Sequence, residues 1–204
     1  MPQQLLIATN NAGKVREFRE LLSDCGWSIV TPTEIGISLE VEETGASYAE
    51  NARIKAEAFA QASGLAALAD DSGLEVDALD GAPGPLHHRL GWDGVDDAER
   101  IQLLLDALKD VPLAQRTGRY RAVIVLCLPS GWIYEAEGVE EGLIIDTPAG
   151  EAGFGYDPIF YIPEQGKTVA QMTMAEKNRV SHRALAAFQI CARLRELSAK
   201  RPVP

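Results

Sequence analysis

Short apolar segments alternate with helix-like segments through the first third of this chain, and this alternation constrains its fold more than any other feature. Residues 5–8 form an apolar run, and beyond a polar loop the apolar side chains of residues 15–22 recur at helical spacing. A second apolar run covers residues 28–31, an alanine-rich helical segment follows from Ser47 to Gly64, and a third run covers residues 65–69. This order of strands and helices is typical of an α/β fold.

The second half of the chain is richer in extended segments. Residues 120–128 and 132–137 are β-rich and are separated by Pro-Ser-Gly, which predicts a hairpin. Ile144 is expected to begin another strand, residues 159–162 form a further one, and a last helix is expected along residues 185–197. The patterns predict one domain over the 204 residues, with two lobes allowed. It would have a mixed, twisted central sheet flanked by helices and a central substrate cleft.

Capping residues mark the starts of three expected helices. Ser47 with Glu50, and Thr173 with Glu176, each have the spacing of a capping box. Asp96 is expected to cap the helix that lies between them in the sequence.

The net charge of the chain is −11, with 30 acidic residues against 19 Lys and Arg residues. Non-specific affinity for nucleic acid comes mainly from basic side chains that meet phosphates, so a long polyanion is not an expected partner. A small anion fits this charge where the few basic residues gather in one cleft. No segment has the length and apolar character of a membrane helix and no secretory signal is recognisable, so a cytoplasmic protein is expected.

Residues 9–14, with the sequence TNNAGK, lie between the first expected strand and the first expected helix. Backbone N–H groups at a helix start can face an anion, and Lys14 adds a full positive charge. The segment is not a Walker loop, because that motif needs an earlier glycine and a hydroxyl at Val15. On these residues alone, a phosphate-binding turn and an ordinary turn capped by asparagine stay equally open.

The segment DDSG at residues 70–73 directly follows an apolar run, so two adjacent carboxylates are expected at a strand end, on opposite faces, before further extended residues at 74–79. A carboxylate there can bind magnesium, which favours oxygen ligands, or orient a water molecule for attack. A turn stabilised by the aspartates is the alternative. Glu42 and Glu43 are the natural second source of metal ligands, although alone they are typical of a solvated charge pair.

Aromatic and basic residues gather in the last quarter of the chain. In the segment GFGYDP at residues 153–158, the aromatic rings could stack on a planar base while Asp157 accepts hydrogen bonds, and a tight loop is the competing interpretation. Lys177, His182 and Arg183 are expected near the start of the last helix, where phosphate or base oxygens would find donors.

These segments, in this order, resemble the family of inosine and xanthosine triphosphate pyrophosphatases of the Ham1 type, which are house-cleaning nucleotide hydrolases. The match runs nearly end to end and rests on ATNNAGKVREF, EETGASYAENARIKA, ALADDSGLEVDALDGAPG, FGYDPIF with EQGKT, and AEKNRVSHR. The resemblance implies hydrolysis of ITP, dITP or XTP between the α and β phosphates, which yields a nucleoside monophosphate and pyrophosphate. It also implies an elongated α/β fold with a central cleft, dependence on magnesium, and a homodimer.

The resemblance further implies a role for each matching residue. Asp71 would accept the proton of the attacking water and bind Mg²⁺, with Glu42 as the other acidic metal contact and Glu43 a close alternative. The aromatic and C-terminal groups would lie nearest to the purine. The residues implied to bind the substrate are Thr9, Asn10, Asn11, Ala12, Gly13, Lys14, Lys55, Ser72, Phe154, Gly155, Tyr156, Asp157, Lys177, His182 and Arg183.

The chain departs from the family pattern in two places. Asn10 stands where the family often has glycine, so the backbone of the first turn is expected to differ. After GAPG, the family commonly has a Ser-Ala-Arg-Tyr-like segment, whereas this chain has HHRL at residues 87–90. This second departure puts a substrate contact there in doubt.

Three other functions stay open at this stage. A nucleotide-binding regulatory protein without catalysis would not need Asp71, Lys14 and Lys55 together. A pyrophosphatase of the Maf kind would act on pyrimidine or modified nucleotides, and the segments FGYDP and SHR favour the purine alternative. A glycosidase with paired carboxylates would gain little from the concentrated basic residues.

Overall fold

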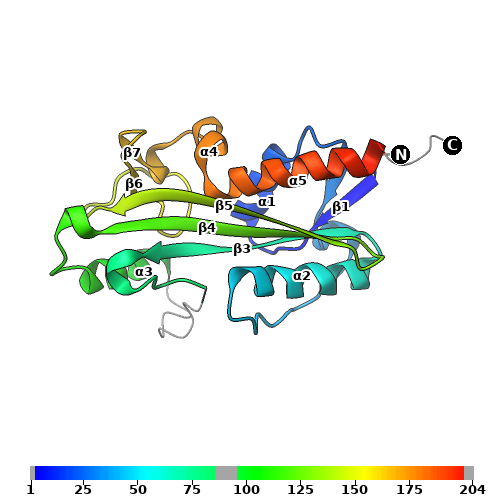
Figure 1. The fold of residues 1–204 in the computed structure, drawn as a ribbon, viewed down its shortest axis with the longest axis horizontal. Coiled ribbons are helices and arrows are strands. Elements are labelled where there is room, and N and C mark those ends of the chain that lie inside the picture. Colours follow the sequence, from blue (N-terminus) through cyan, green and yellow to red (C-terminus); the bar gives the residue numbers. More distant parts are fainter. Residues whose placement is uncertain (1–2, 86–95, 200–204) are drawn as a thin grey trace. The chain divides into compact units, whose positions relative to one another are not determined.

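The structure, a computed structural model, describes residues 3–85 and 96–199 (Figure 1). Its helices and strands are, in chain order, β1 (Gln3–Ile7), α1 (Ala12–Leu21), β2 (Trp27–Val30), α2 (Tyr48–Ser63), β3 (Ala66–Val76), α3 (Asp97–Ala107), β4 (Thr117–Cys127), β5 (Ile133–Ile144), β6 (Phe160–Ile162), β7 (Lys167–Thr168), α4 (Met174–Val180) and α5 (His182–Ala199). Within these residues the strands form one seven-stranded sheet in the order β2-β1-β3-β4-β5-β6-β7. β1 pairs in parallel with β2 and β3, whereas β6 pairs antiparallel with β5 and β7. The predicted mixed sheet with flanking helices is confirmed.

The chain divides into two compact units, and β3, β4 and β5 supply residues to both. The first unit holds the described residues among 1–71, 122–138 and 183–204. The second unit holds those among 72–121 and 139–182. The expectation of one domain with lobes around a central cleft stays a prediction.

In the first unit, helices cover both faces of the strands because side chains alternate along each strand. Leu5 and Ile7 of β1 pack with residues of α1 and α5, whereas Leu6 packs with residues of α2. Figure 1 shows α1 and α5 on one side of these strands and α2 on the other. Adjacent residues of one strand therefore enter two different cores.

The second unit has a core of its own. Leu74 of β3, Leu104 of α3, Tyr120 of β4 and Phe160 of β6 are all buried in it. Residues of β3, β4 and β5 thus take part in the cores of both units.

Two strand boundaries expected from the sequence are wrong. The segment at 70–73 was expected to end a strand, but β3 runs without interruption through it as far as Val76. Aspartate is disfavoured in strands because its side chain competes for backbone hydrogen bonds, but here basic side chains bind both carboxylates. Ile144 was expected to begin a strand, but it is the last residue of β5.

The expected last helix is also divided. α4 ends at Val180, and α5 begins at His182. Ser181 has an extended backbone, with φ −64° and ψ 148°, which interrupts the helical path between the two helices.

No helix among residues 3–85 and 96–199 combines the length and apolar character that crossing a membrane requires.

The predicted helix caps are largely confirmed. Asp96 caps α3, and Thr173 with Glu176 forms a complete capping box at α4. Ser47 caps α2 by accepting from the backbone of Glu50, but the Glu50 carboxylate accepts from Ala46 N instead of from Ser47 N. The second hydrogen bond of the capping box at α2 therefore comes from the residue before Ser47.

Candidate functional site

The turn after β1 contains the first predicted phosphate contacts. Asn11 caps α1, since its Oδ1 accepts from Lys14 N at 3.1 Å, and its own N–H donates to Thr9 Oγ1 at 3.2 Å. Among the non-glycine residues that the structure describes, a positive φ occurs at Asp80 alone. Asn10 therefore adopts an ordinary backbone conformation, and the turn does not depend on the glycine that the family often has there.

A pocket of about 600 Å³ lies beside this turn, within the first unit. Thr9, Asn10 and Ala12 line it together with Arg16 and Arg19 of α1. The side chains of Asn10 and Arg16 are exposed. The turn therefore faces a hollow bordered by the start of α1 and by two arginines, of which Arg19 also binds Glu34.

Asp70 lies on the face of β3 that packs against α1 and α5, and it holds two basic side chains. Its Oδ1 lies 3.1 Å from Lys14 Nζ, and its Oδ2 accepts from Nε and Nη2 of Arg183, each at 3.1 Å. Arg183 also donates from Nη1 to Glu17 Oε2 at 2.6 Å. Burial alone would raise the pKa of Asp70, but the charges of Lys14 and Arg183 outweigh it and hold this pKa well below its usual range.

This buried network fixes the position of Lys14 at the start of α1. The side chain of Asp70 is fully buried, that of Arg183 is 2% exposed, and that of Lys14 is 16% exposed. Burial lowers the pKa of Lys14, and the charge of Asp70 opposes that shift. Lys14 therefore keeps a small accessible surface while a carboxylate holds its ammonium group in place.

Asp71 lies on the opposite face of β3, toward α2, and belongs to a more open group. Asn51 Nδ2 donates to Asp71 Oδ2 at 3.1 Å, and Lys55 Nζ lies 3.8 Å from Oδ1. Lys55 also donates to Glu43 Oε2 at 3.0 Å. Burial raises the pKa of Asp71 against the opposing charge of Lys55, and the charge of Glu43 adds to the rise. We call Asp71, Asn51, Lys55 and Glu43 the Asp71 group.

Glu42 and Glu43 are both exposed, but Glu43 pairs with Lys55, whereas Glu42 has no ion pair among the described residues. In residues 3–85 and 96–199, no three His, Cys, Asp or Glu side chains gather as a metal-binding cluster. Magnesium does not need such a cluster, because it is commonly bound by one or two carboxylates together with substrate phosphates and water. Asp71 and Glu43 are oxygen donors of this kind, so the residues present fit the ion. The prediction of Glu42 as a metal contact stays a prediction.

The aromatic segment lies in the second unit and is organised by Asp157. The buried Asp157 Oδ2 accepts from Phe154 N at 3.1 Å and from Lys177 Nζ at 2.8 Å. The Lys177 ammonium lies 5.1 Å from the centre of the Phe154 ring, which is a cation–π contact. Gly153 has φ +83°, and a Cβ at this position would lie 2.0 Å from Asp157 Oδ2. Glycine is therefore required where the turn closes on the carboxylate.

The neighbouring residues of this segment have different surroundings. Gly155 N donates to Asp97 Oδ2 at 2.7 Å, and Tyr156 is buried in the core of the second unit. Ser72 is a partly buried residue of β3, one position beyond Asp71. The hydrogen bonds of Asp157 hold this segment as a tight loop, and stacking of Phe154 on a base stays a prediction.

His182 is buried in the second unit between two side chains of the sheet. Its ring stacks on Tyr120, with centroids 4.8 Å apart and an interplanar angle of 19°. Its Nδ1 lies 3.5 Å from Glu140 Oε2. Burial raises the pKa of Tyr120 well above its usual range, and the charge of Asp157 and a hydrogen bond to it act in the same direction. His182, Tyr120 and Asp157 are thus connected side chains.

The break at Ser181 separates the two basic residues that follow it. His182 belongs to the second unit with Glu140 and Tyr120, whereas Arg183 belongs to the first unit with Asp70 and Glu17. The expected position near the start of the last helix is confirmed for His182 and Arg183, which begin α5, and is wrong for Lys177, which lies in the last turn of α4. Arg183 binds two buried carboxylates, and its contact with substrate stays a prediction.

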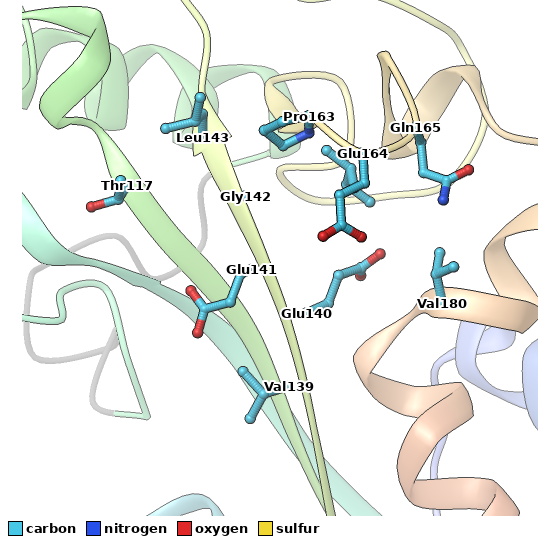
Figure 2. Close-up of a pocket in the computed structure, with 11 residues that line it drawn as sticks. Thr117, Val139, Glu140, Glu141, Gly142, Leu143, Pro163, Glu164, Gln165 and Val180 are labelled. Atoms are coloured by element: carbon cyan, nitrogen blue, oxygen red, sulfur yellow. The ribbon is translucent and has the colours of Figure 1, made fainter.

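A further pocket of about 520 Å³ lies in the second unit beside β5 (Figure 2). Glu140, Gly142, Glu164 and Val180 are among the residues that line it. Figure 2 shows the carboxylates of Glu140 and Glu164 pointing toward one another. Glu140, which contacts His182, therefore also borders a cavity.

Several residues that hold the predicted ones in place were not found from the sequence. Asn51 lies one helical turn before Lys55. It could have been found as a polar residue on the buried face of α2. Glu140 occupies an inward position of β5 between the small residues Gly138 and Gly142. The alternation of buried and exposed residues along that strand could therefore have shown that it points inward. The contacts of Glu17 have no local signal, because its partner Arg183 is 166 residues away. The HHRL segment at 87–90 lies outside the described residues.

The chain is similar over most of its length to known proteins of one family. The model of the Ham1 family matches residues 5–193. A dITP/XTP pyrophosphatase of Desulforamulus reducens is 48% identical over 194 residues, which cover 94% of this chain and 96% of that protein. A protein of the same name from Bacillus subtilis is 44% identical and covers 89% of this chain and 92% of its own length. The structure of a HAM1 protein from Coxiella burnetii superposes with a TM-score of 0.85 at 40% identity, covering 95% of this chain and 99% of that one.

Proposed function

The chain belongs to the Ham1 family, and from this premise we propose that it hydrolyses dITP, ITP and XTP to the nucleoside monophosphate and pyrophosphate. The relatives named dITP/XTP pyrophosphatase match over about nine-tenths of the chain or more, at identities of 44–48%. This similarity supports a nucleoside triphosphate pyrophosphatase that removes non-canonical purine nucleotides.

The observation that carries the proposal is the environment of Asp71. This carboxylate is partly buried, accepts a hydrogen bond from Asn51 and lies beside Lys55 in the same unit as the turn at residues 9–14. A general base works best when its pKa lies near the working pH, and burial moves the pKa of Asp71 upward in that direction. Asp71 is therefore suited to take a proton from an attacking water molecule.

The remaining residues of the first unit suit the phosphates. Lys14 and Lys55 supply positive charge, and the N–H groups at the start of α1 supply hydrogen-bond donors. In the reaction, water forms a bond to phosphorus, the α–β anhydride bond breaks, and pyrophosphate leaves with the bonding electron pair. The proton of the water passes to Asp71 and then to solvent, so no covalent intermediate is needed.

We also propose magnesium as the metal, with Asp71 and one of Glu42 and Glu43 as its protein contacts. Of these two glutamates, the position of Glu43 beside Lys55 supports Glu43. Bound magnesium would neutralise charge on the phosphate oxygens and stabilise the departing pyrophosphate. The expected homodimer and cytoplasmic location stay predictions.

The base would be bound by groups of the second unit, namely Phe154, Lys177 and His182. Phe154 has an aromatic face that can stack on a purine, and His182 has a ring nitrogen that can meet a polar edge. Asp157 is also proposed to contact the substrate, and its Oδ2 accepts hydrogen bonds from Phe154 N and Lys177 Nζ.

The test is pyrophosphate release from ITP, XTP, dITP, ATP, GTP, dTTP and UTP with magnesium, with the nucleotide product identified. A strong preference for ITP, dITP and XTP with a monophosphate product is expected, and excess chelator should abolish it. Preference for a pyrimidine would favour the Maf-like alternative. Binding of ITP without turnover would favour the regulatory protein, and full activity in chelator would contradict the metal.

A further inference from the structure

Glu140 is a buried carboxylate whose position next to His182 needs an explanation. The side chains of Glu140 and His182 are 5% and 6% exposed, and Glu140 Oε2 lies 3.5 Å from His182 Nδ1. A buried carboxylate is costly unless a positive charge or hydrogen-bond donors compensate it. Glu140 and His182 are therefore expected to act as a pair.

The protonation of His182 decides what its other ring nitrogen can do. If the ring is neutral with its proton on Nδ1 toward Glu140, then Nε2 is an acceptor. If the ring is protonated on both nitrogens, then Nε2 is a donor. A carboxylate held against Nδ1 stabilises the doubly protonated form, because it lies beside the positive charge in a region with little water.

Three other titratable side chains lie near this pair: Tyr120, Asp157 and, across the pocket from Glu140, Glu164. Tyr120 of β4 stacks on the ring, and its raised pKa keeps the hydroxyl neutral. Asp157 interacts with Tyr120 and with the ammonium of Lys177, so its charge has a partner of its own. Glu140 of β5 contacts the imidazole directly, through Oε2.

We propose that Glu140 is a specificity-determining positioning residue, which holds His182 as an imidazolium so that Nε2–H donates to the C6 carbonyl oxygen of the purine. This inference rests on the proposed function. Hypoxanthine and xanthine present an acceptor at C6, whereas adenine presents an amino group that would meet the donor unfavourably. The Glu140–His182 pair thus rejects adenine nucleotides.

The same chemistry limits what the pair can discriminate. Guanine also has a carbonyl oxygen at C6, so a donor on His182 does not separate GTP from ITP. The exclusion of guanine must come from groups near C2. The effect of Glu140 is therefore confined to the comparison between 6-oxo and 6-amino purines.

The test is the variant Glu140→Gln, which keeps the size and the acceptor oxygen but removes the charge. The ratio of kcat/KM for ITP to that for ATP is expected to fall about tenfold, as for loss of a charge-assisted hydrogen bond. The ratio for ITP to GTP should stay constant, and the change for ITP should appear mainly in KM. An equal fall for every nucleotide would overturn the proposal, because it would indicate a purely structural role.

The matched control is Glu141→Gln on the same strand. Glu141 is exposed and pairs with Arg119, with Oε1 3.0 Å from Nε, away from His182. This variant is expected to leave all nucleotide ratios at their wild-type values. A loss of selectivity equal to that of Glu140→Gln would show a general effect of charge on this strand and would contradict the proposal.

A measurement without substrate separates this inference from the proposed function. The ¹⁵N shifts of the His182 imidazole, assigned by comparison with His182→Gln, are expected to show an imidazolium at neutral pH in the wild type and a neutral ring in Glu140→Gln. A neutral ring in the wild type would overturn the role of Glu140 even if ITP is hydrolysed. If His182 is an imidazolium but the protein does not hydrolyse ITP, the effect of Glu140 on His182 would be supported and the proposed function would be contradicted.

Discussion

Asp70 and Asp71 are adjacent in the sequence, yet β3 places them in two different electrostatic environments. Asp70 faces α1 and α5, is fully buried and binds both Lys14 and Arg183. Asp71 faces α2, keeps 13% of its side chain exposed and lies beside Lys55 and Asn51. Ion pairs lower the pKa of the first carboxylate despite its burial, whereas burial raises the pKa of the second.

This difference shows how one strand can separate a structural carboxylate from a reactive one. The charge of Asp70 is used to hold basic groups in place, so little of it is available to a substrate. The charge of Asp71 is less completely neutralised and partly accessible, as a proton acceptor requires. The four predictions that follow test this comparison.

The largest effect is expected from Asp71→Asn. Removal of a general base slows turnover by about 10³-fold, while the fold and much of the affinity for nucleotide stay intact. Steady-state kinetics with ITP would measure the loss, and circular dichroism would check the fold. Activity near the wild-type level would rule out Asp71 as the base.

The main effect of Asp70→Asn should be a loss of stability. It leaves Lys14 and Arg183 without a counter-charge in a buried region, so the free energy of unfolding should fall by about 3 kcal/mol. Urea denaturation measures this change. The control is Asp77→Asn, where an exposed pair with Arg119 should contribute less than about 1 kcal/mol. Equal effects of the two variants would contradict the structural role of Asp70.

The two acidic loop residues should differ in their effect on the metal. Glu43→Gln is expected to raise the magnesium concentration needed for half-maximal activity by about tenfold or more, since even indirect contacts with a metal have effects of that size. Glu42→Gln is the matched control and should leave it constant. A magnesium titration of ITP hydrolysis makes the comparison, and the reverse result would assign the metal contact to Glu42.

The smallest effect concerns pH and has opposite signs for the two aspartates. The lowered pKa of Asp70 in the folded state gives stability at neutral pH that is lost as pH falls from about 4 through the folded pKa. The raised pKa of Asp71 means that its ionised form costs stability at neutral pH, and this cost disappears as pH falls below the unfolded value, about 3.9.

In chelator at pH 7, Asp71→Asn should therefore unfold at a higher temperature than the wild type, and Asp70→Asn at a lower one. The difference for Asp71→Asn should shrink toward pH 4, whereas the difference for Asp70→Asn should persist at pH 4 and shrink only below it. Thermal unfolding at a series of pH values measures them. Destabilisation by Asp71→Asn at pH 7 would show that its carboxylate is stabilising and would remove the contrast between the two residues.

The sequence by itself determined much of the local architecture. Alternating apolar runs and helical spacing predicted α1, α2 and the strands before them, since strands repeat every two residues and helices every 3.6. Capping residues predicted the starts of α3 and α4, because an N-cap hydrogen bond depends on neighbours three positions away. The motif order also pointed to the Ham1 family, and the family model confirms it.

Only the tertiary structure decided which of the two adjacent aspartates is fully buried and which is partly exposed. Strand alternation predicts that Asp70 and Asp71 face opposite sides, but the partners that distinguish them come from far along the chain, as Arg183 lies 113 residues after Asp70. The break at Ser181 and the pairing of Glu140 with His182 are likewise set by packing between distant elements. Local patterns report on neighbours in the sequence, whereas the charge and exposure of a buried group depend on everything that folds around it.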